Sequence, residues 1–316
     1  RDTAASEFLT QQDQYRELDM GLEIRELLPL IDGKILGFGT TEASIFGNDQ
    51  IVLFRLNSSG AIDRTFGTNG VTLVSNGELI ALDATGIAIR TDQKIVVLSE
   101  ARHTDGRNVV LLRFTADGIL DSTFGSLGIT SYDSGESDYP TSLVIDSEQR
   151  ILVANNRCCD APRAAIVRFT PNGQLDTGFD GATALATLGA SNNVSQMKLD
   201  ANQKIVLVGS AFTSGSLALV ARLLPNGQLD SDFSADGFTL VDLDDIETAN
   251  RYSYFVDFVI TDTGKIAAIG GGNTPNKLEA VVFFKDNGNL DVNGTNQTGI
   301  TRFVSATGVD YAELNS

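Results

Sequence analysis

The sequence predicts an all-β fold built from repeated units. An apolar run followed by a glycine turn, VVLLRFTADGILDSTFGSLG from Val109 to Gly128, recurs with variations at four other places along the 316 residues. A regular spacing of about 57 residues separates the copies, and a period of that size is typical of repeat architectures. Apolar segments are short and are separated by turns rich in glycine, Asn and Asp, which favours strands over long helices. The first glycines of the copies, at intervals of 58, 55, 54 and 61 residues, are Gly60, Gly118, Gly173, Gly227 and Gly288.

The repeats set the expected domain boundaries. Residues 1–20 have no repeat counterpart, and we interpret them as an N-terminal tail or a closing strand. Residues 21–316 form a single domain of five repeats of about 57 residues. The segment 299–315 supplies the last strand and one extra strand, which would pair with the N-terminal segment to close a ring. Alternatively, the chain is a piece of a longer protein.

Each repeat contains four apolar segments in a fixed order. The first two are joined by a short polar turn, such as Asp92-Gln93-Lys94, and form a hairpin. The second and third, such as 95–99 and 109–114, are apolar without alternation, so both faces of these strands must be covered. Four short strands per repeat, in sheets covered on both faces by their neighbours, predict a five-bladed β-propeller of four-stranded antiparallel blades.

The motifs resemble a known repeat. The "DGKI" turn, the apolar strand that ends in Arg and an aromatic residue, and the P-N-G-Q-L-D-x-x-F-x-x-x-G element are similar to the bacterial delta-60 type β-propeller repeat, over about 290 residues. The resemblance implies a large secreted or cell-surface protein and says little about activity. The fifth copy departs from the pattern, with Phe283 in place of the arginine and Gly294 in place of the phenylalanine. We expect a distorted corner there.

Charge limits the class of partner. The chain has 41 acidic and 23 basic residues and a formal charge of −18, so its field repels phosphate backbones and anionic lipid surfaces. We therefore expect no nucleic-acid partner. The absence of any apolar run near the roughly 18 residues of a membrane span predicts no membrane insertion. An acidic surface also suits an exported protein that must stay soluble.

An arginine and an aspartate recur eight residues apart in four copies. A site usually draws different residues from different blades, whereas a part that recurs serves the fold. We expect each Asp to accept turn N–H groups and each Arg to pair with that Asp or to stack on the nearby Phe. The joint loss of Arg and Phe in the fifth copy favours stacking. The pairs are Arg55/Asp63, Arg113/Asp121, Arg168/Asp176 and Arg222/Asp230.

Cofactor and metal signals are weak. Carboxylates gather at Asp230–Asp236, at Asp242–Asp245 and around Asp133 and Asp138, and clusters of this kind suit calcium. None has the spacing of an EF-hand loop, and solvated turns explain them as well. We expect no cofactor, with calcium as the open alternative and any metal site unknown.

Catalytic motifs are absent from the sequence, which contains neither Gly-x-Ser-x-Gly nor His-Glu-x-x-His. The one histidine, His103, lies in a polar loop. Five-bladed glycosidases collect carboxylates from separate blades, and sequence spacing does not reveal such a pair. An extracellular carbohydrate-active enzyme or lectin-like domain is therefore the alternative to a non-catalytic role.

Adjacent cysteines are the most unusual local feature. Cys158 and Cys159 stand in a polar loop, where they form either a strained vicinal disulfide in an oxidising compartment or two free thiols. We favour the disulfide.

The loops predict where a partner binds. Turns between the first and second strands, and corners after the third, lie at one end of the sheets and repeat closely; the remaining loops lie at the other end and differ from copy to copy. Copy-specific loops on a rigid scaffold suit recognition. We therefore expect a secreted or cell-surface bacterial protein that acts as a non-catalytic binding or structural module. Its partner, a protein or a glycan, would contact the variable end. The protein could also be part of a larger surface assembly. The predicted contacts are Arg102, His103, Tyr139, Arg157, Cys158, Cys159, Arg251 and Tyr252.

Overall fold

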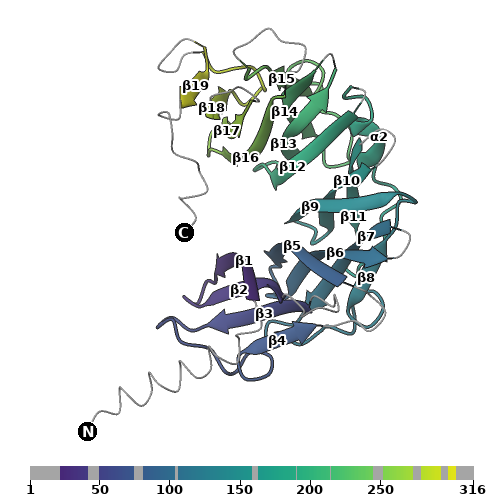
Figure 1. The fold of residues 1–316 in the computed structure, drawn as a ribbon, viewed down its shortest axis with the longest axis vertical. Helices are drawn as coiled ribbons and strands as arrows, with labels where there is room; N and C mark the ends of the chain where they lie inside the picture. Colours follow the sequence, from purple (N-terminus) through teal and green to yellow (C-terminus); the bar gives the residue numbers. More distant parts are fainter. Residues whose placement is uncertain are drawn as a thin grey trace. The chain divides into compact units, whose positions relative to one another are not determined.

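The structure is a computed structural model that describes residues 22–41, 50–74, 81–103, 106–158, 163–189, 191–213, 215–244, 252–272, 279–292 and 298–303. Its described residues form five antiparallel sheets and one short helix (Figure 1). We number the sheets 1 to 5 in chain order. The chain divides into two compact units, Arg1–Pro140 and Thr141–Ser316. None of the helices in the described part of the chain has the length and apolar character needed to cross a membrane.

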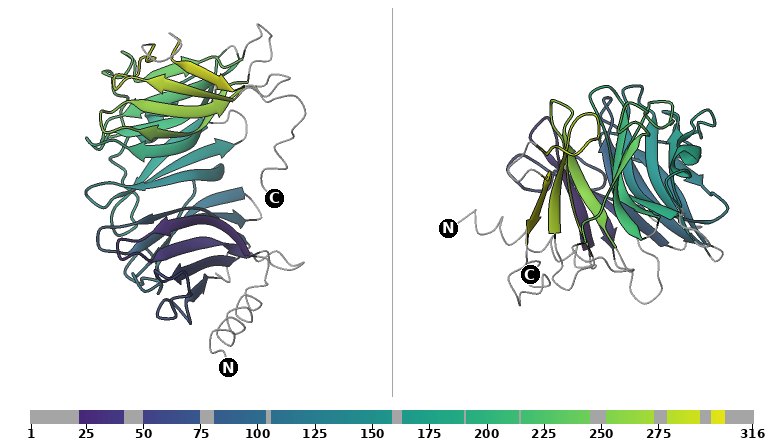
Figure 2. Two further views of the ribbon diagram at one scale, coloured as in Figure 1. Left: turned by 90° about the vertical axis from the view of Figure 1, so that its left-hand side faces the viewer. Right: turned by 90° about the horizontal axis from the view of Figure 1, so that it is seen from above.

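Unit 1 contains sheets 1 and 2. Each is a four-stranded meander in which consecutive strands pair side by side, as Figure 2 also shows. All eight strands contain segments that the repeat pattern predicts. The second and third strands of sheet 2 extend into the loop expected at residues 100–108, so the backbone of His103 lies in a strand and not in a loop. Sheet 1 comprises β1 (Leu22–Pro29), β2 (Ile35–Thr41), β3 (Gln50–Leu56) and β4 (Val71–Val74), and sheet 2 comprises β5 (Ala81–Ile89), β6 (Ile95–His103), β7 (Gly106–Phe114) and β8 (Ile129–Tyr132).

Unit 2 contains sheets 4 and 5 and most of sheet 3, whose first strand begins shortly before the division at Pro140. Sheets 4 and 5 are four-stranded meanders, and sheet 3 has three strands in the order β11-β10-β9. Sheet 3 comprises β9 (Ser137–Ile145), β10 (Ile151–Cys158) and β11 (Arg163–Phe169), sheet 4 comprises β12 (Ser191–Leu199), β13 (Ile205–Phe212), β14 (Ser216–Leu223) and β15 (Phe238–Val241), and sheet 5 comprises β16 (Tyr254–Ile260), β17 (Ile266–Gly271), β18 (Glu279–Phe284) and β19 (Ile300–Phe303).

Sheet 3 corrects the prediction of four strands in every blade. Where the other copies have a fourth strand, the third copy has the helix α2 (Gly181–Leu185). In three other copies a glycine four residues after the corner phenylalanine adopts a positive φ, for example 98° at Gly70, and the chain then enters the fourth strand. The third copy has Thr183 at this position, and a left-handed backbone is costly for a β-branched residue. The chain continues instead as a helical turn, and Leu185 of α2 is fully buried in the core.

The middle strands carry the core. In sheets 1 to 4 the second and third strands are buried on both faces, as their continuous apolar sequences predict. Within each unit, one face of a sheet packs against the opposite face of the next: Leu36 and Phe38 of sheet 1 lie in one cluster with Val97 of sheet 2. Val208 of sheet 4 lies in one cluster with Phe258 of sheet 5.

Sheet 5 departs from the expectation of two covered faces. Burial alternates along β17 and β18, and the side chains of Ile269 and Phe283 are each 42% exposed. Their counterparts in sheet 4, Val208 and Arg222, lie against sheet 5. The described chain has no further sheet after sheet 5, so the equivalent face remains half-open to solvent.

A β-bulge recurs in the first strand of sheets 1, 2, 4 and 5, where the register shifts between residues such as Val194 and Gln196. The bulge brings the first strand close to the second: a β-carbon on Gly209 would lie 2.0 Å from the carbonyl oxygen of Asn193. In sheet 2 this position is Ser99, whose hydroxyl donates to the equivalent carbonyl, that of Asp83. The bulge is therefore a built part of the repeat and was not visible in the hydrophobic pattern.

Candidate functional site

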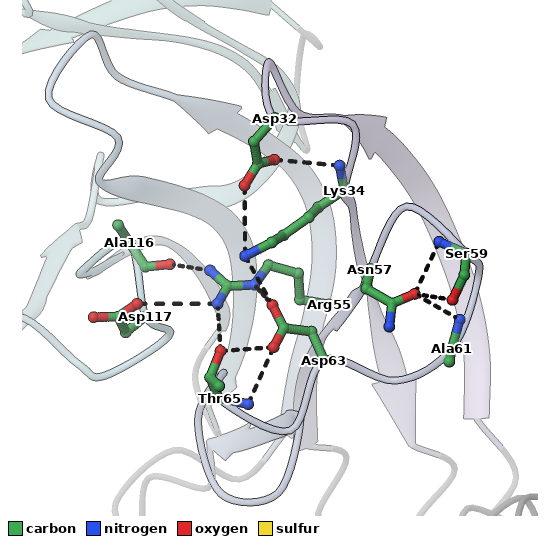
Figure 3. A network of polar contacts seen from close by, with 10 residues as sticks. All are labelled: Asp32, Lys34, Arg55, Asn57, Ser59, Ala61, Asp63, Thr65, Ala116 and Asp117. Carbon is green, nitrogen blue, oxygen red and sulfur yellow. Dashed lines mark hydrogen bonds and ion pairs between the residues drawn. The ribbon is translucent and has the colours of Figure 1, made fainter.

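The recurring aspartate is the centre of a corner at one end of each sheet. The Asp63 carboxylate accepts a backbone hydrogen bond from Thr65 at 3.1 Å and a second from the Thr65 hydroxyl at 2.6 Å. It also accepts a hydrogen bond from Arg55 Nε at 2.8 Å and forms an ion pair with Lys34 at 3.1 Å (Figure 3). Lys34 belongs to the turn between β1 and β2. These contacts show that this turn and the corner after β3 lie at one end of the sheet, which we call the turn end.

The arginine joins its own sheet to the next one in the same unit. The Arg55 guanidinium lies 4.9 Å from the centre of the Phe66 ring, and its Nη1 donates to the carbonyl of Ala116 in sheet 2 at 2.8 Å. The same links recur at Arg168 and Arg222, whose Nη1 atoms donate to the backbone carbonyls of Pro225 and Asp286. Ion pairing and stacking on Phe are thus both present, as predicted. The four Arg–Phe distances are 4.9, 4.7, 4.4 and 4.7 Å.

The corner carboxylates are held in the charged form. Hydrogen bonds from Thr65 and Lys34 keep the pKa of Asp63 well below its usual range, against the opposing effect of burial. Burial alone would raise the pKa of Asp121, but hydrogen bonds from Lys94 and Thr123 outweigh it and lower the pKa. Asp230 is similar: burial opposes ionisation, and Lys204 and Arg222 lower its pKa. Three corner aspartates therefore stabilise the fold as anions.

Corner residues of consecutive repeats fit into one another. A β-carbon on Gly118 would lie 2.5 Å from the ring of Phe66, and one on Gly288 would lie 2.7 Å from the ring of Phe233. In these two repeats the first glycine makes room for the phenylalanine of the repeat before it, whereas a β-carbon on Gly227 would meet the backbone of Asp180 and Gly181. Gly60 has the same left-handed backbone, with φ of 84°, but nothing lies within 4 Å of its missing side chain. The repeated glycine and phenylalanine have a shared structural role.

Cavities at the turn end lie at equivalent places in the two units. A cavity of about 530 Å³ between sheets 1 and 2 is lined by Lys34, Arg55 and Asp117, and one of about 670 Å³ between sheets 4 and 5 is lined by Lys204 and Arg222. Each of these cations already binds a corner aspartate. The cavities therefore follow from the repeated junction between neighbouring sheets, and these cations are paired within the fold.

Two repeats vary the corner. In the third, Arg150 replaces the turn lysine and pairs with Asp146 at 2.6 Å rather than with Asp176. In the fifth, Lys265 still reaches Asp291 at 2.7 Å, while Phe283 occupies the arginine position. Gly294, the second position at which we expected a distorted corner, lies outside the described residues.

The opposite end of the sheets, the loop end, carries the predicted binding residues. The structure brings two of them, Arg102 and Tyr139, into one cluster in unit 1. Arg107 joins them: its guanidinium lies 4.8 Å from the centre of the Tyr139 ring and donates to the carboxylate of Glu100. Arg102 Nε lies 3.4 Å from the same carboxylate. Glu100 is buried, with a side chain 7% exposed, whereas the side chain of Arg102 is 48% exposed.

Other predicted residues lie apart from this cluster. Arg157 and Cys158 end strand β10, and each is partly exposed. Tyr252 is exposed in unit 2, lies 5.7 Å from the ring of Tyr254, and donates its backbone N–H to Asp244 at 2.7 Å. The side chain of His103, together with the residues Cys159 and Arg251, lies outside the described residues. Cys158 is a free thiol in the structure, which does not support the vicinal disulfide that we favoured from the sequence.

Sequence reasoning missed three charged residues at the loop end: Glu100, Arg107 and Arg163. The available signal was their place at the two ends of hairpins. Strand register sets Arg102 directly opposite Arg107 in sheet 2, and Arg157 directly opposite Arg163 in sheet 3. Such pairing depends on the loop length and on the register, which the hydrophobic pattern alone does not determine.

Metal ligation finds no support in the described part of the chain, where no group of three or more His, Cys, Asp or Glu side chains is arranged to hold an ion. Of the carboxylates considered for calcium, Asp230 binds Lys204 and Arg222. Asp138 accepts the backbone N–H of Ser134 at 3.0 Å. Asp245 lies outside the described residues. Calcium binding stays untested.

Four segments of the chain match one family of known repeats. Residues 32–66, 91–124, 160–179 and 201–233 match a family described as "Domain of unknown function (DUF5122) beta-propeller". Three of the matches begin in or next to the first turn of a repeat, and all four end at the stacked phenylalanine. Over these residues the chain is thus similar to the repeats of a β-propeller family. No curated protein matches the sequence.

Solved structures resemble the chain at low identity. A protein of unknown function from Dyadobacter fermentans is 10% identical, with a TM-score of 0.51 over 91% of this chain and 84% of that one. An ulvan lyase, crystallised with the saccharide GlcA(1-4)Rha3S, is 11% identical, with a TM-score of 0.49 over 84% and 67%. An endo-1,5-α-L-arabinanase from Thermotoga petrophila is 10% identical, with a TM-score of 0.39 over 87% and 78%. The first of these supports the fold, and none assigns an activity.

Proposed function

We propose that this chain is a non-catalytic binding module, secreted or attached to the bacterial cell surface, whose five sheets are the blades of one β-propeller of the delta-60 repeat type. The observation that carries the proposal is the difference between the two ends of the sheets. At the turn end, the arginines, lysines and aspartates of the corners bind one another. At the loop end, side chains differ from copy to copy, and Arg102 remains half-exposed. The half-exposed Arg102 therefore offers a ligand an accessible guanidinium at the loop end.

The test is to find the ligand class and the end of the sheets that it covers. The full chain would be applied to an array of neutral, uronate-containing and sulfated polysaccharides, and each binder would be incubated with the protein and analysed for cleavage products. Hydrogen exchange would then locate the footprint of the best binder. We expect binding without products and protection of the hairpin ends of β6–β7 or β10–β11.

Cleavage products would refute the non-catalytic role and support the alternative, a carbohydrate-active enzyme. A footprint confined to the corners at the turn end would refute the assignment of the binding surface. As a matched test, Arg102→Gln should weaken binding at least tenfold while the thermal midpoint shifts by less than about 2 °C, because the Arg102 side chain is half-exposed and exposed substitutions seldom change stability by more than about 0.5 kcal/mol.

A further inference from the structure

One face of sheet 5, in unit 2, carries exposed apolar side chains, and we call it the open face. Strand register aligns Val259, Ala267 and Phe283 across three strands, and Ile269 and Phe303 lie on the same face, because residues opposite each other or two apart share a face. The large side chains are 58% exposed at Val259, 42% at Ile269 and Phe283, and 54% at Phe303. Apolar groups gathered in contact with water mark an interaction surface.

The equivalent face of sheet 4 packs against another sheet. Val208 and Val220 of sheet 4, which lie opposite each other, belong to one buried cluster with Phe258 of sheet 5. Their counterparts in sheet 5 are Ile269 and Val281. The exposed fraction rises from 0% at Val208 to 42% at Ile269. The open face therefore has the position and the apolar character of a surface that packs against a further sheet.

Two residues make a sheet of the repeat type a poor occupant of the open face. Phe283 replaces the arginine that, as at Arg222, donates to a backbone carbonyl of the next sheet. Glu279 is exposed and stands where the other copies bury an apolar residue against their neighbour, so packing of the repeat type would bury a carboxylate among apolar groups. The apolar counterparts of Glu279 are Ile51, Val109, Ala164 and Ala218.

The open face has charges of opposite sign at its two ends. Glu279 lies at the loop end, and Lys265 lies at the turn end. The side chain of Lys265 is 55% exposed, whereas that of its counterpart Lys204, in the cavity between sheets 4 and 5, is 23% exposed. Two copies packed face to face with antiparallel strands would bring Glu279 of each near Lys265 of the other. A twofold axis supplies both contacts at once, since such an interface pairs a surface with itself.

We propose that the open face of sheet 5 packs against the open face of a second copy of this chain and forms a twofold dimer. The proposal goes beyond the binding module and does not depend on its ligand. Four strands of about six residues cover roughly 20 Å by 20 Å, given about 4.8 Å between strands and about 3.3 Å per residue. An interface of this size belongs to the weak class, so we expect dissociation in the micromolar range or above.

Sedimentation velocity of the full chain, over about a hundredfold range of concentration, tests the proposal. We expect the mass to rise from one chain to two and no further. Phe283→Arg places a charge in the face and should weaken association about tenfold or more. This variant should fold, because four other copies have arginine at that position. Phe212→Arg, at a phenylalanine of sheet 4 that is 48% exposed, is the matched control and should change association less than twofold.

A second variant serves if Phe283→Arg fails to fold by circular dichroism. Val259→Lys also places a charge in the open face, and sheet 4 accommodates Lys198 at the same position. It should weaken association about as much as Phe283→Arg. Unchanged association in every folded variant of the two would overturn the proposal.

Glu279→Gln tests the antiparallel arrangement. Loss of the contact with Lys265 of the other copy should weaken association about two- to fivefold, as expected for an exposed ion pair. Stronger association would mean that Glu279 is buried without a partner, as in packing against a sheet of the repeat type, and would overturn the twofold pairing. Masses that grow beyond two chains would also overturn it. A mass of one chain at every concentration would overturn the dimer while leaving the proposed binding module intact.

Discussion

The second and fifth repeats carry the same corner aspartate in different surroundings. In the second, Asp121 contacts Arg113, Lys94 and Thr123, and the side chain of Arg113 is 2% exposed. In the fifth, Asp291 keeps its lysine, but Phe283 stands in the arginine position and is 42% exposed. The ion pair between the turn lysine and the corner aspartate thus forms without the arginine.

This difference teaches what the arginine adds. Where a sheet is followed by another in the same unit, the arginine reaches the carbonyl of the next sheet, as Arg55 and Arg222 do. Sheet 5 lacks both the arginine and a following described sheet. The arginine therefore serves the junction between sheets, while the aspartate serves the turn within one sheet.

The largest effect should follow from removing the arginine of the second repeat. Arg113→Met leaves Asp121 buried with only part of its compensation, and breaking a buried pair costs about 3 kcal/mol of unfolding free energy. Phe283→Met at the equivalent position should cost less than about 1 kcal/mol, because it exchanges apolar groups of similar size on a half-exposed face. Urea unfolding of both variants measures the difference. Similar midpoints for the two would mean that the arginine has no special role.

A second pair of variants separates the backbone role of the repeated glycine from its packing role. Gly60 and Gly118 have φ angles of 84° and 78°, so an alanine at either position carries a similar backbone cost of about 1 kcal/mol. Only Gly118→Ala also forces the Phe66 ring to move, which adds about 1–2 kcal/mol. The thermal unfolding midpoint of Gly118→Ala should therefore lie well below that of Gly60→Ala. Equal losses would show that the ring adjusts freely.

Acid should weaken the corners that hold a depressed pKa. The folded pKa values of Asp63, Asp121 and Asp230 lie below the unfolded value of about 3.9, so the unfolded chain takes up protons first as the pH falls. Their contribution is complete at neutral pH and is lost progressively below about pH 4. Asp121→Asn should lower stability at pH 7 and flatten its decline between pH 4 and pH 2. A decline as steep as that of the unmodified protein would show that other groups control acid unfolding.

Much of this repeat was readable in the sequence, and the unread parts have physical reasons. Short-range patterns predicted the strands, the hairpin turns and the Arg–Asp–Phe corner, because each depends on residues within about ten positions. The helix α2 stands where the other copies have a strand, and the sequence difference at that place is Thr183 instead of a glycine. The bulges depend on the approach of two backbones, as at Gly209 and Asn193, and the facing arginines depend on strand register. Neither leaves a periodic signal.

The smallest effect concerns the turns between the first and second strands, which have the same shape but different residues. The residue before the turn cation has a positive φ in all five copies; it is glycine in the first and fifth but glutamine in the others, with φ of 61° at Gln203 and 78° at Gly264. Glycine adopts this conformation without the side-chain clash that strains glutamine. Gln203→Gly should therefore stabilise sheet 4 by about 0.5–1 kcal/mol, and Gly264→Ala should destabilise sheet 5 by a similar amount.

The side chain of Gln203 also accepts the backbone N–H of Ser147 at 2.7 Å, so Gln93→Gly serves as the control in a turn for which no such acceptor contact is seen. A loss of stability at Gln203 with a gain at Gln93 would assign the glutamine a role in that contact, whereas losses at both would show that the strain is relieved elsewhere.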